Sequence, residues 1–103
     1  MSWQRISPEA AAALMAEKAV AIVDVRDAHS WQVAHMPGAQ HLDNQSAQAF
    51  MTQANKEEPV LVYCYHGHSS QSVAAWLSEK GFSEVYSLDG GFEIWRLNHE
   101  VER

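Results

Sequence analysis

The chain has 103 residues, enough for one compact domain with a hydrophobic core and too few for two independent ones, and we predict a single domain over residues 1–103. A formal net charge of −6, with only seven scattered Lys and Arg residues, excludes a general nucleic-acid binder, because phosphate contacts need a basic patch. A single cysteine excludes intramolecular disulfides, and no apolar run approaches the roughly 18 residues of a membrane span. Without an export signal, the chain is predicted to be cytoplasmic and to make no membrane contact.

The first predicted elements are a helix and a buried strand. Ser7, Pro8 and Glu9 are typical of a helix start, with a serine cap, a proline in the first turn and a carboxylate near the positive end of the helix dipole. This helix is predicted to run to about Lys18. The β-branched apolar run at residues 20–25 then predicts a strand buried on both faces, which carries Asp24 and Arg26 to its carboxyl end.

Shorter elements are predicted in the middle of the chain. Residues 27–34 fit a short helix, and the neighbouring Pro37 and Gly38 mark a turn. Residues 39–42 fit a short strand. Apolar residues at helical spacing predict a further helix within residues 44–55.

The last part of the chain repeats the alternation of strand and helix. Residues 60–63 form the second β-branched run, which ends at Cys64, and a helix is predicted from Ser69 or Ser70 to Lys80, with Gly81 as its stop. Residues 84–88 fit another strand, and a glycine turn then leads into a last short helix. This order predicts an α/β fold with a central, mostly parallel β-sheet flanked by α-helices on both faces.

The position of Cys64, directly after a predicted buried strand, indicates a binding site. In an open α/β sheet, ligands bind beyond the carboxyl ends of the strands. The loop that follows runs straight into a helix, so its backbone N–H groups can form an anion-binding nest, with Gly67 in a left-handed conformation. Such a nest favours the nucleophilic thiolate over the thiol, and it holds a small dianion despite the negative net charge. A lone cysteine can also be a purely structural buried thiol.

Three other kinds of chemistry fit the cysteine less well. A cysteine phosphatase needs an arginine six positions after its nucleophile, where this chain has Ser70, and a thioredoxin-like activity needs a second cysteine. Cys64, His66 and His68 lack the paired spacing and fourth ligand of a structural zinc site, so no metal is predicted. Sulfur transfer needs only one cysteine: the thiolate attacks a sulfur that bears a good leaving group, becomes a persulfide, and an external acceptor takes the sulfur.

Four segments resemble the rhodanese-like sulfurtransferases, and within them the small single-domain bacterial thiosulfate sulfurtransferases. The segments are VDVRD at 23–27, AHMPGAQHL at 34–42, VYCYHGHSS at 62–70 and VYSLDGGFEIW at 85–95. The resemblance covers nearly the whole chain and implies a small rhodanese fold. It further implies that the cysteine takes the sulfane sulfur of thiosulfate, releases sulfite, and passes the sulfur to cyanide or to a thiol such as reduced thioredoxin in a ping-pong cycle. No metal or organic cofactor is implied.

The same resemblance implies roles for individual residues. Cys64 is the expected nucleophile, and Ser70 is expected to add a hydroxyl. The residues whose amides are expected to cradle the persulfide and the substrate anion are Tyr65, His66, Gly67, His68 and Ser69. Ala34 stands where many members of the family have glycine, and we expect a slightly altered turn there with no lost chemistry.

Several alternatives remain open at the level of sequence. His66 and His68 either hydrogen-bond the sulfonate part of the donor or are solvated loop residues. Asp24 and Arg26 either support the active loop, with Arg26 adding positive potential, or form a structural ion pair. The whole domain could instead be a rhodanese-like carrier or binding module that holds sulfur for one protein partner, or a redox-sensing thiol.

Overall fold

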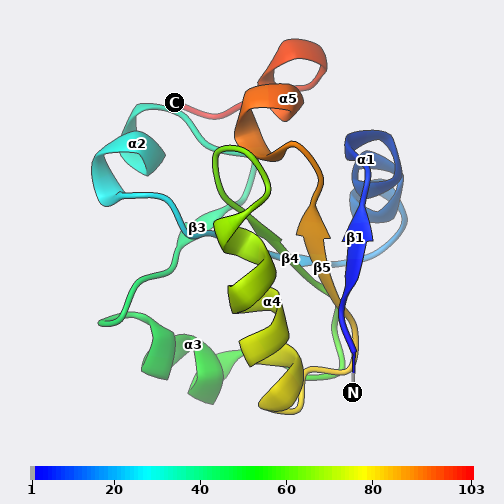
Figure 1. Cartoon of the computed structure of the whole chain (residues 1–103), viewed down its shortest axis with the longest axis vertical. Helices are drawn as coiled ribbons and strands as arrows, with labels where there is room; N and C mark the ends of the chain where they lie inside the picture. Colours follow the sequence, from blue (N-terminus) through cyan, green and yellow to red (C-terminus); the bar gives the residue numbers. More distant parts are fainter. Residues whose placement is uncertain (1) are drawn as a thin grey trace.

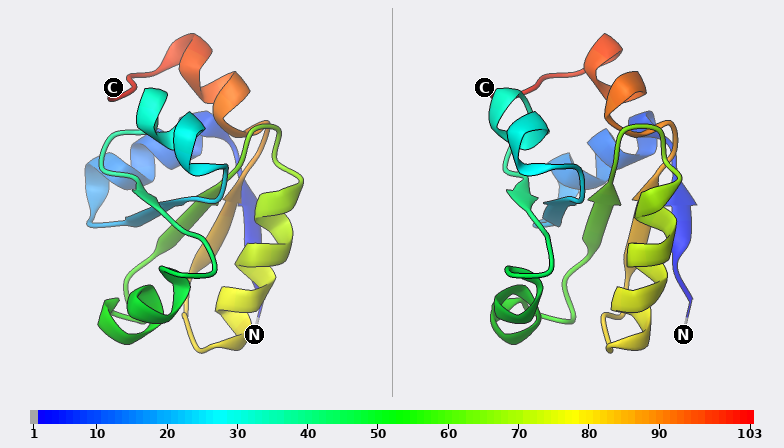
Figure 2. Two further views of the ribbon diagram at one scale, coloured as in Figure 1. Left: turned by 90° about the vertical axis from the view of Figure 1, so that its left-hand side faces the viewer. Right: turned by 60° about the vertical axis from the view of Figure 1, so that its left-hand side comes forward.

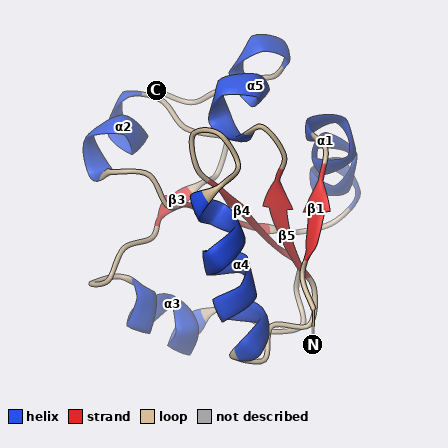
Figure 3. Cartoon of the chain, in the orientation of Figure 1, coloured by secondary structure: helices blue, strands red, loops and turns tan. Residues whose placement is uncertain are grey.

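The computed structural model describes residues 2–103, and in this part of the chain it has a five-stranded parallel sheet with helices on both faces (Figure 1, Figure 3). The strands lie in the order β1-β5-β4-β2-β3. They are β1 (Gln4–Ile6), β2 (Ala21–Asp24), β3 (Gln40–His41), β4 (Val60–Tyr63) and β5 (Val85–Leu88). The helices are α1 (Pro8–Glu17), α2 (Ala28–Val33), α3 (Ala47–Gln53), α4 (Ser69–Glu79) and α5 (Gly91–Asn98). The predicted fold class is confirmed.

Side chains alternate between the two faces of the sheet and build two hydrophobic clusters. In β2, Ile22 belongs to one cluster and Val23 to the other, and in β4 the same division separates Leu61 from Val62. One cluster packs against α1 and α5, and the other packs against α3 and α4, which lie together on one side of the sheet in Figure 2. Both central strands are therefore buried on both faces, as their β-branched sequences predict.

Local sequence explains where most helices begin. Ser7 caps α1, since its hydroxyl accepts the N–H of Ala10 at 3.1 Å, and this predicted cap is confirmed. The helix expected from residue 44 begins later, at Ala47. Asp43 is the reason: its carboxylate accepts the N–H groups of Gln45 and Ser46, each at 2.9 Å, and these bonds form a turn in place of the first helical turn.

The strand β1 is absent from the elements predicted above. It is three residues long, lies at the edge of the sheet and pairs only with β5, through a register that places Arg5 opposite Ser87. A short polar edge strand carries no alternation of buried and exposed side chains, so it gives little local signal. The end of β5, and with it the start of α5, lies beside the loop after β4 because β5 pairs with β4 on its other side.

Candidate functional site

Cys64 lies at the carboxyl end of β4, between the ends of β2 and β5, and only 6% of its surface is exposed. The loop after it connects β4 to α4 and lies at the same edge of the sheet as α2 and the start of α5 (Figure 1). The helix begins at Ser69, with His68 as its cap, and β4 ends at Tyr63, so the connection from strand to helix spans five residues, 64–68. This placement is the one that the sequence predicts for a nucleophile in an α/β fold.

The Cys64 sulfur accepts hydrogen bonds from backbone groups of its own loop. Its Sγ accepts the N–H of Gly67 at 3.2 Å and the N–H of Ser70 at 3.3 Å, and it lies 3.4 Å from the Ser70 hydroxyl oxygen. Burial raises the pKa of the thiol, but the hydrogen bonds from Ser70, Gly67 and His66 favour the thiolate, and the net pKa is below the ordinary value. The loop is thus built to stabilise a negative charge at this sulfur.

The predicted left-handed glycine of this loop is confirmed. Gly67 has a φ of +91°, and a Cβ at this position would lie 3.0 Å from the backbone nitrogen of Gly90. The start of α5 holds the other side of the loop, because the N–H of Phe92 donates to the Cys64 carbonyl at 2.8 Å and the N–H of Glu93 donates to the Tyr65 carbonyl at 3.1 Å. Two backbone segments far apart in sequence therefore fix the position of the thiol.

Asp24 and Arg26 form a buried ion pair beside the loop. Arg26 Nη2 lies 2.6 Å from Asp24 Oδ2, and their side chains are 3% and 0% exposed. Burial lowers the pKa of Arg26, but the hydrogen bond and the charge of Asp24 outweigh it and raise the pKa overall. The guanidinium also lies over the Tyr65 ring, 5.1 Å from its centroid, and donates to the carbonyl of Ala34 at 2.6 Å. The Arg26 charge is therefore paired with Asp24, and the guanidinium contacts the ring of Tyr65, the first residue after Cys64.

The model of the Rhodanese-like domain matches residues 7–98. The chain belongs to this family. Curated relatives include the thiosulfate sulfurtransferase GlpE of Pseudomonas putida, which is 50% identical over 97% of this chain and 91% of its own length. The thiosulfate sulfurtransferase GlpE of Stutzerimonas stutzeri is 56% identical over 91% of this chain and 85% of its own length. A rhodanese-like domain from Anabaena has the same fold, with a TM-score of 0.84, 22% identity and coverage of 95% of this chain and 77% of that one.

In this rhodanese-like domain the two loop histidines face solvent. His66 and His68 are exposed, and the imidazoles make no hydrogen bond to any residue among 2–103. Both histidines line an opening of about 200 Å³ above the thiol. The residues that line this opening are Val25, Arg26, Cys64, Tyr65, His66, His68 and Ser69. Both imidazoles are therefore solvated, and their position beside the opening allows contact with an anion there, so both interpretations from the sequence stay open.

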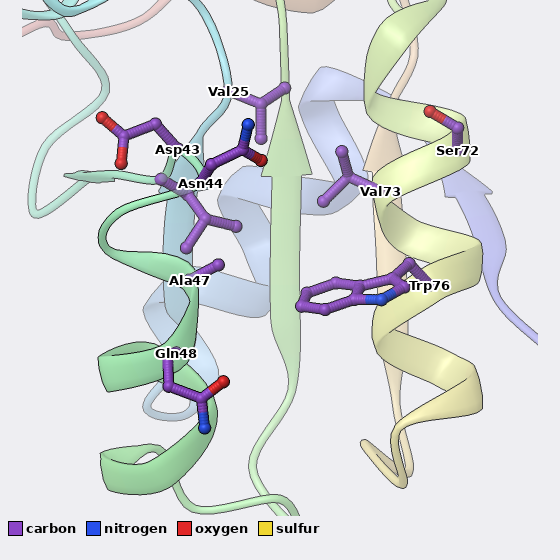
Figure 4. Close-up of a pocket in the computed structure, with 9 residues that line it drawn as sticks. Val25, Asp43, Asn44, Ala47, Gln48, Ser72, Val73 and Trp76 are labelled. Carbon is purple, nitrogen blue, oxygen red and sulfur yellow. The ribbon is translucent and has the colours of Figure 1, made fainter.

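A larger groove of the rhodanese-like domain lies beside the thiol rather than over it. It runs between α3 and α4, has a volume of about 630 Å³, and shares Val25 with the opening above Cys64. Figure 4 shows the Trp76 ring extending from α4 across this groove, and 37% of the residue is exposed. Of the two, only the smaller opening is lined by Cys64.

Two further observations concern metals and membranes. In the part of the chain that the structure describes, no three His, Cys, Asp or Glu side chains come close enough to hold a metal ion. Within residues 2–103, no helix has the length and apolar character needed to cross a bilayer.

One residue near the sulfur is missing from the sequence-based site. Ser87 lies on β5, is 1% exposed, and its Oγ is 2.8 Å from the Oγ of Ser70. The sequence does contain one indication of its role, a serine within an otherwise apolar strand. A hydroxyl buried in such a strand needs a hydrogen-bond partner. Its partner cannot be chosen from the sequence, because that choice depends on β5 lying next to β4.

Proposed function

We propose that this chain is a thiosulfate sulfurtransferase that carries sulfur as a persulfide on Cys64. The observation that carries the proposal is the hydrogen-bonded sulfur, with Gly67 and Ser70 amides at 3.2 and 3.3 Å at the start of α4. The identity of about half of the residues to curated thiosulfate sulfurtransferases, over 97% of the chain, supports thiosulfate as the donor.

The first half of the cycle loads sulfur onto the protein. The Cys64 thiolate attacks the outer, sulfane sulfur of thiosulfate, a new S–S bond forms, and the bond between the two thiosulfate sulfurs breaks with both electrons going to sulfite. One negative charge on the thiolate and two on thiosulfate become one on the persulfide and two on sulfite, so neither a proton nor an external oxidant is consumed. Cys64 is the only cysteine and therefore the only candidate nucleophile of this type.

The loop residues have distinct roles in this step. We expect the amides of residues 65–69, at the amino end of α4, to stabilise the negative charge that collects as the outer sulfur is transferred, an arrangement of the oxyanion-hole type. The N–H groups that donate to the Cys64 sulfur itself are those of Gly67 and Ser70. The Ser70 hydroxyl oxygen lies 3.4 Å from the sulfur, and the hydroxyl can donate to it once the thiol has ionised. Exposed His66 and His68 line the opening, where their ring N–H groups can donate hydrogen bonds to the sulfonate oxygens. Asp24 and Arg26 position the loop through Tyr65.

The second half of the cycle unloads the sulfur to an external acceptor. Cyanide attacks the outer persulfide sulfur and leaves as thiocyanate, or a thiolate attacks it and leaves as a new persulfide, and Cys64 returns as thiolate in both cases. A dithiol such as reduced thioredoxin can release the sulfur as sulfide by closing its own disulfide. All electron pairs come from donor, thiolate and acceptor, so the cycle needs no metal or organic cofactor. One domain over residues 1–103, in a reducing compartment such as the cytoplasm, suffices.

Intact-protein mass spectrometry after brief incubation with thiosulfate tests the proposal. We expect a gain of one sulfur, about 32 Da, that cyanide reverses in the native chain and that is absent in Cys64→Ser, which keeps nearly the same shape. No gain with thiosulfate would contradict the donor assignment. Sulfur loading that only one protein partner reverses would indicate a carrier, and stable sulfenylation by peroxide without sulfur loading would indicate a redox sensor.

A further inference from the structure

Two buried hydroxyls continue the hydrogen-bonded site from the Cys64 sulfur into the sheet. Ser70 Oγ lies 3.4 Å from Cys64 Sγ and 2.8 Å from Ser87 Oγ. Ser70 is 0% exposed and Ser87 is 1% exposed, so bulk water reaches neither hydroxyl. The three residues come from three elements, because Cys64 follows β4, Ser70 lies in the first turn of α4 and Ser87 lies on β5.

The number of protons and acceptors sets the direction of these hydrogen bonds. Each serine hydroxyl donates one proton. Within residues 2–103, Ser87 Oγ has one hydrogen-bond partner, Ser70 Oγ, whereas Ser70 Oγ lies between Ser87 and the sulfur. If Ser70 donated to Ser87, the Ser87 proton would have no partner in a buried site and the sulfur would lose its hydroxyl donor. When Cys64 is a thiolate, which carries no proton and can only accept, the opposite direction uses both serine protons.

We propose that Ser87 is a positioning residue that donates to Ser70 Oγ and thereby directs the Ser70 proton onto the Cys64 sulfur. The inference rests on the proposed role of Cys64 as the nucleophile. Ser87 touches neither thiosulfate nor the reacting sulfur, and it acts only through Ser70. Consecutive hydrogen bonds polarise one another, so the donor from Ser87 makes the Ser70 hydroxyl a stronger donor to the thiolate. Without it, the Ser70 hydroxyl is free to turn away from the sulfur.

The pH profile of Cys64 alkylation by iodoacetamide tests this inference without any sulfur transfer. The reagent is uncharged and reacts with the thiolate, so the midpoint of the rate profile reports how easily the thiol ionises. We expect Ser70→Ala to raise the midpoint by about one pH unit and Ser87→Ala to raise it by about half a unit, a roughly threefold loss of thiolate below the midpoint. The double variant should match Ser70→Ala alone, because Ser87 has no other route to the sulfur.

Ser78→Ala is the matched control. Ser78 is also 1% exposed, and its hydroxyl has no hydrogen-bond partner among the described residues. It lies in α4, like Ser70, so its replacement removes a buried hydroxyl from the same region without touching the chain of hydrogen bonds. Its midpoint should equal that of the native chain. A purely structural effect of losing a buried serine would shift this control as well.

A second pair of variants keeps the test independent of packing defects. Ser87→Thr retains the hydroxyl and should keep the native midpoint, whereas Ser87→Val has nearly the same shape without the hydroxyl and should shift it like Ser87→Ala. Equal midpoints for the threonine and valine variants would overturn the inference, as would a shift from Ser87→Ala that persists in full in the Ser70→Ala background. Failure of thiosulfate loading in a protein with the expected alkylation profiles would instead contradict the proposed function alone.

Discussion

At the scale of single residues, the hydrogen bonds to Cys64 predict the pH dependence of sulfur loading. Burial raises the pKa of the thiol, but hydrogen bonds from Ser70 and Gly67 lower the pKa by more, so the net pKa lies below the ordinary value. A lowered pKa keeps the thiolate populated below the value of about 8.5 of a free cysteine, and loading slows only as the pH falls through the lower midpoint. Stopped-flow or quenched mass spectrometry of thiosulfate loading from pH 5 to 10 measures this midpoint. A midpoint at or above that of free cysteine would contradict the geometry of the loop.

The buried ion pair beside the loop predicts a large loss of stability when one partner is neutralised. Asp24→Asn leaves the Arg26 guanidinium buried without a counter-charge, and we expect the free energy of unfolding to fall by about 3–5 kcal/mol. The exposed pair of Arg5 and Asp89, with side chains 65% and 38% exposed, is the control, and Arg5→Ala should cost less than about 1 kcal/mol. Urea unfolding measures both. Equal effects of the two substitutions would show that the buried pair is not structural.

At the scale of elements, the approach of α5 to the loop predicts that Gly91 accepts no side chain. Its φ is +62°, and a Cβ there would lie 2.4 Å from the carbonyl carbon and oxygen of Tyr65. Gly38 has a similar φ of +78°, but a Cβ built there would have no atom within 4 Å. The substitution Gly38→Ala therefore measures only the cost of placing a side chain in the left-handed conformation, roughly 1–2 kcal/mol of unfolding free energy. Gly91→Ala should cost about 1–3 kcal/mol more, because the loop must move, and should also slow sulfur loading. Comparable unfolding midpoints and loading rates in the two variants would contradict this contact.

The elements that the sequence predicts well are those whose patterns are local. The β-branched runs at residues 20–25 and 60–63 are buried on both faces in β2 and β4, so burial and composition agree. The strand β1 depends instead on pairing Gln4 with Tyr86, far along the chain, and two of its three residues are polar and exposed. The site divides in the same way. Cys64 and Gly67 follow from one loop, whereas the contact of Ser87 with Ser70 exists only because β5 lies next to β4.

At the scale of the whole molecule, the distribution of charge opposes the proposed substrate. The chain has 13 Asp and Glu residues against seven Lys and Arg residues, while thiosulfate is a dianion. The one arginine at the opening, Arg26, is neutralised by Asp24. Attraction therefore comes from the amides of the loop, which act at contact range, whereas the repulsion from distant carboxylates acts across the whole domain of 32 × 27 × 23 Å. The two effects differ in how they respond to salt.

This difference predicts that thiosulfate loading accelerates with ionic strength. The screening length falls from about 30 Å at 0.01 M salt to about 8 Å at 0.15 M, so monovalent salt removes much of the long-range repulsion and leaves the amide contacts nearly unchanged. A net charge of −6 acting on a dianion should give a roughly fivefold rise in the second-order rate constant of loading over this range. Alkylation of Cys64 by uncharged iodoacetamide is the control and should change little. A loading rate that falls with salt would mean that positive charge near the opening, and not the net charge of the chain, dominates the field met by the substrate.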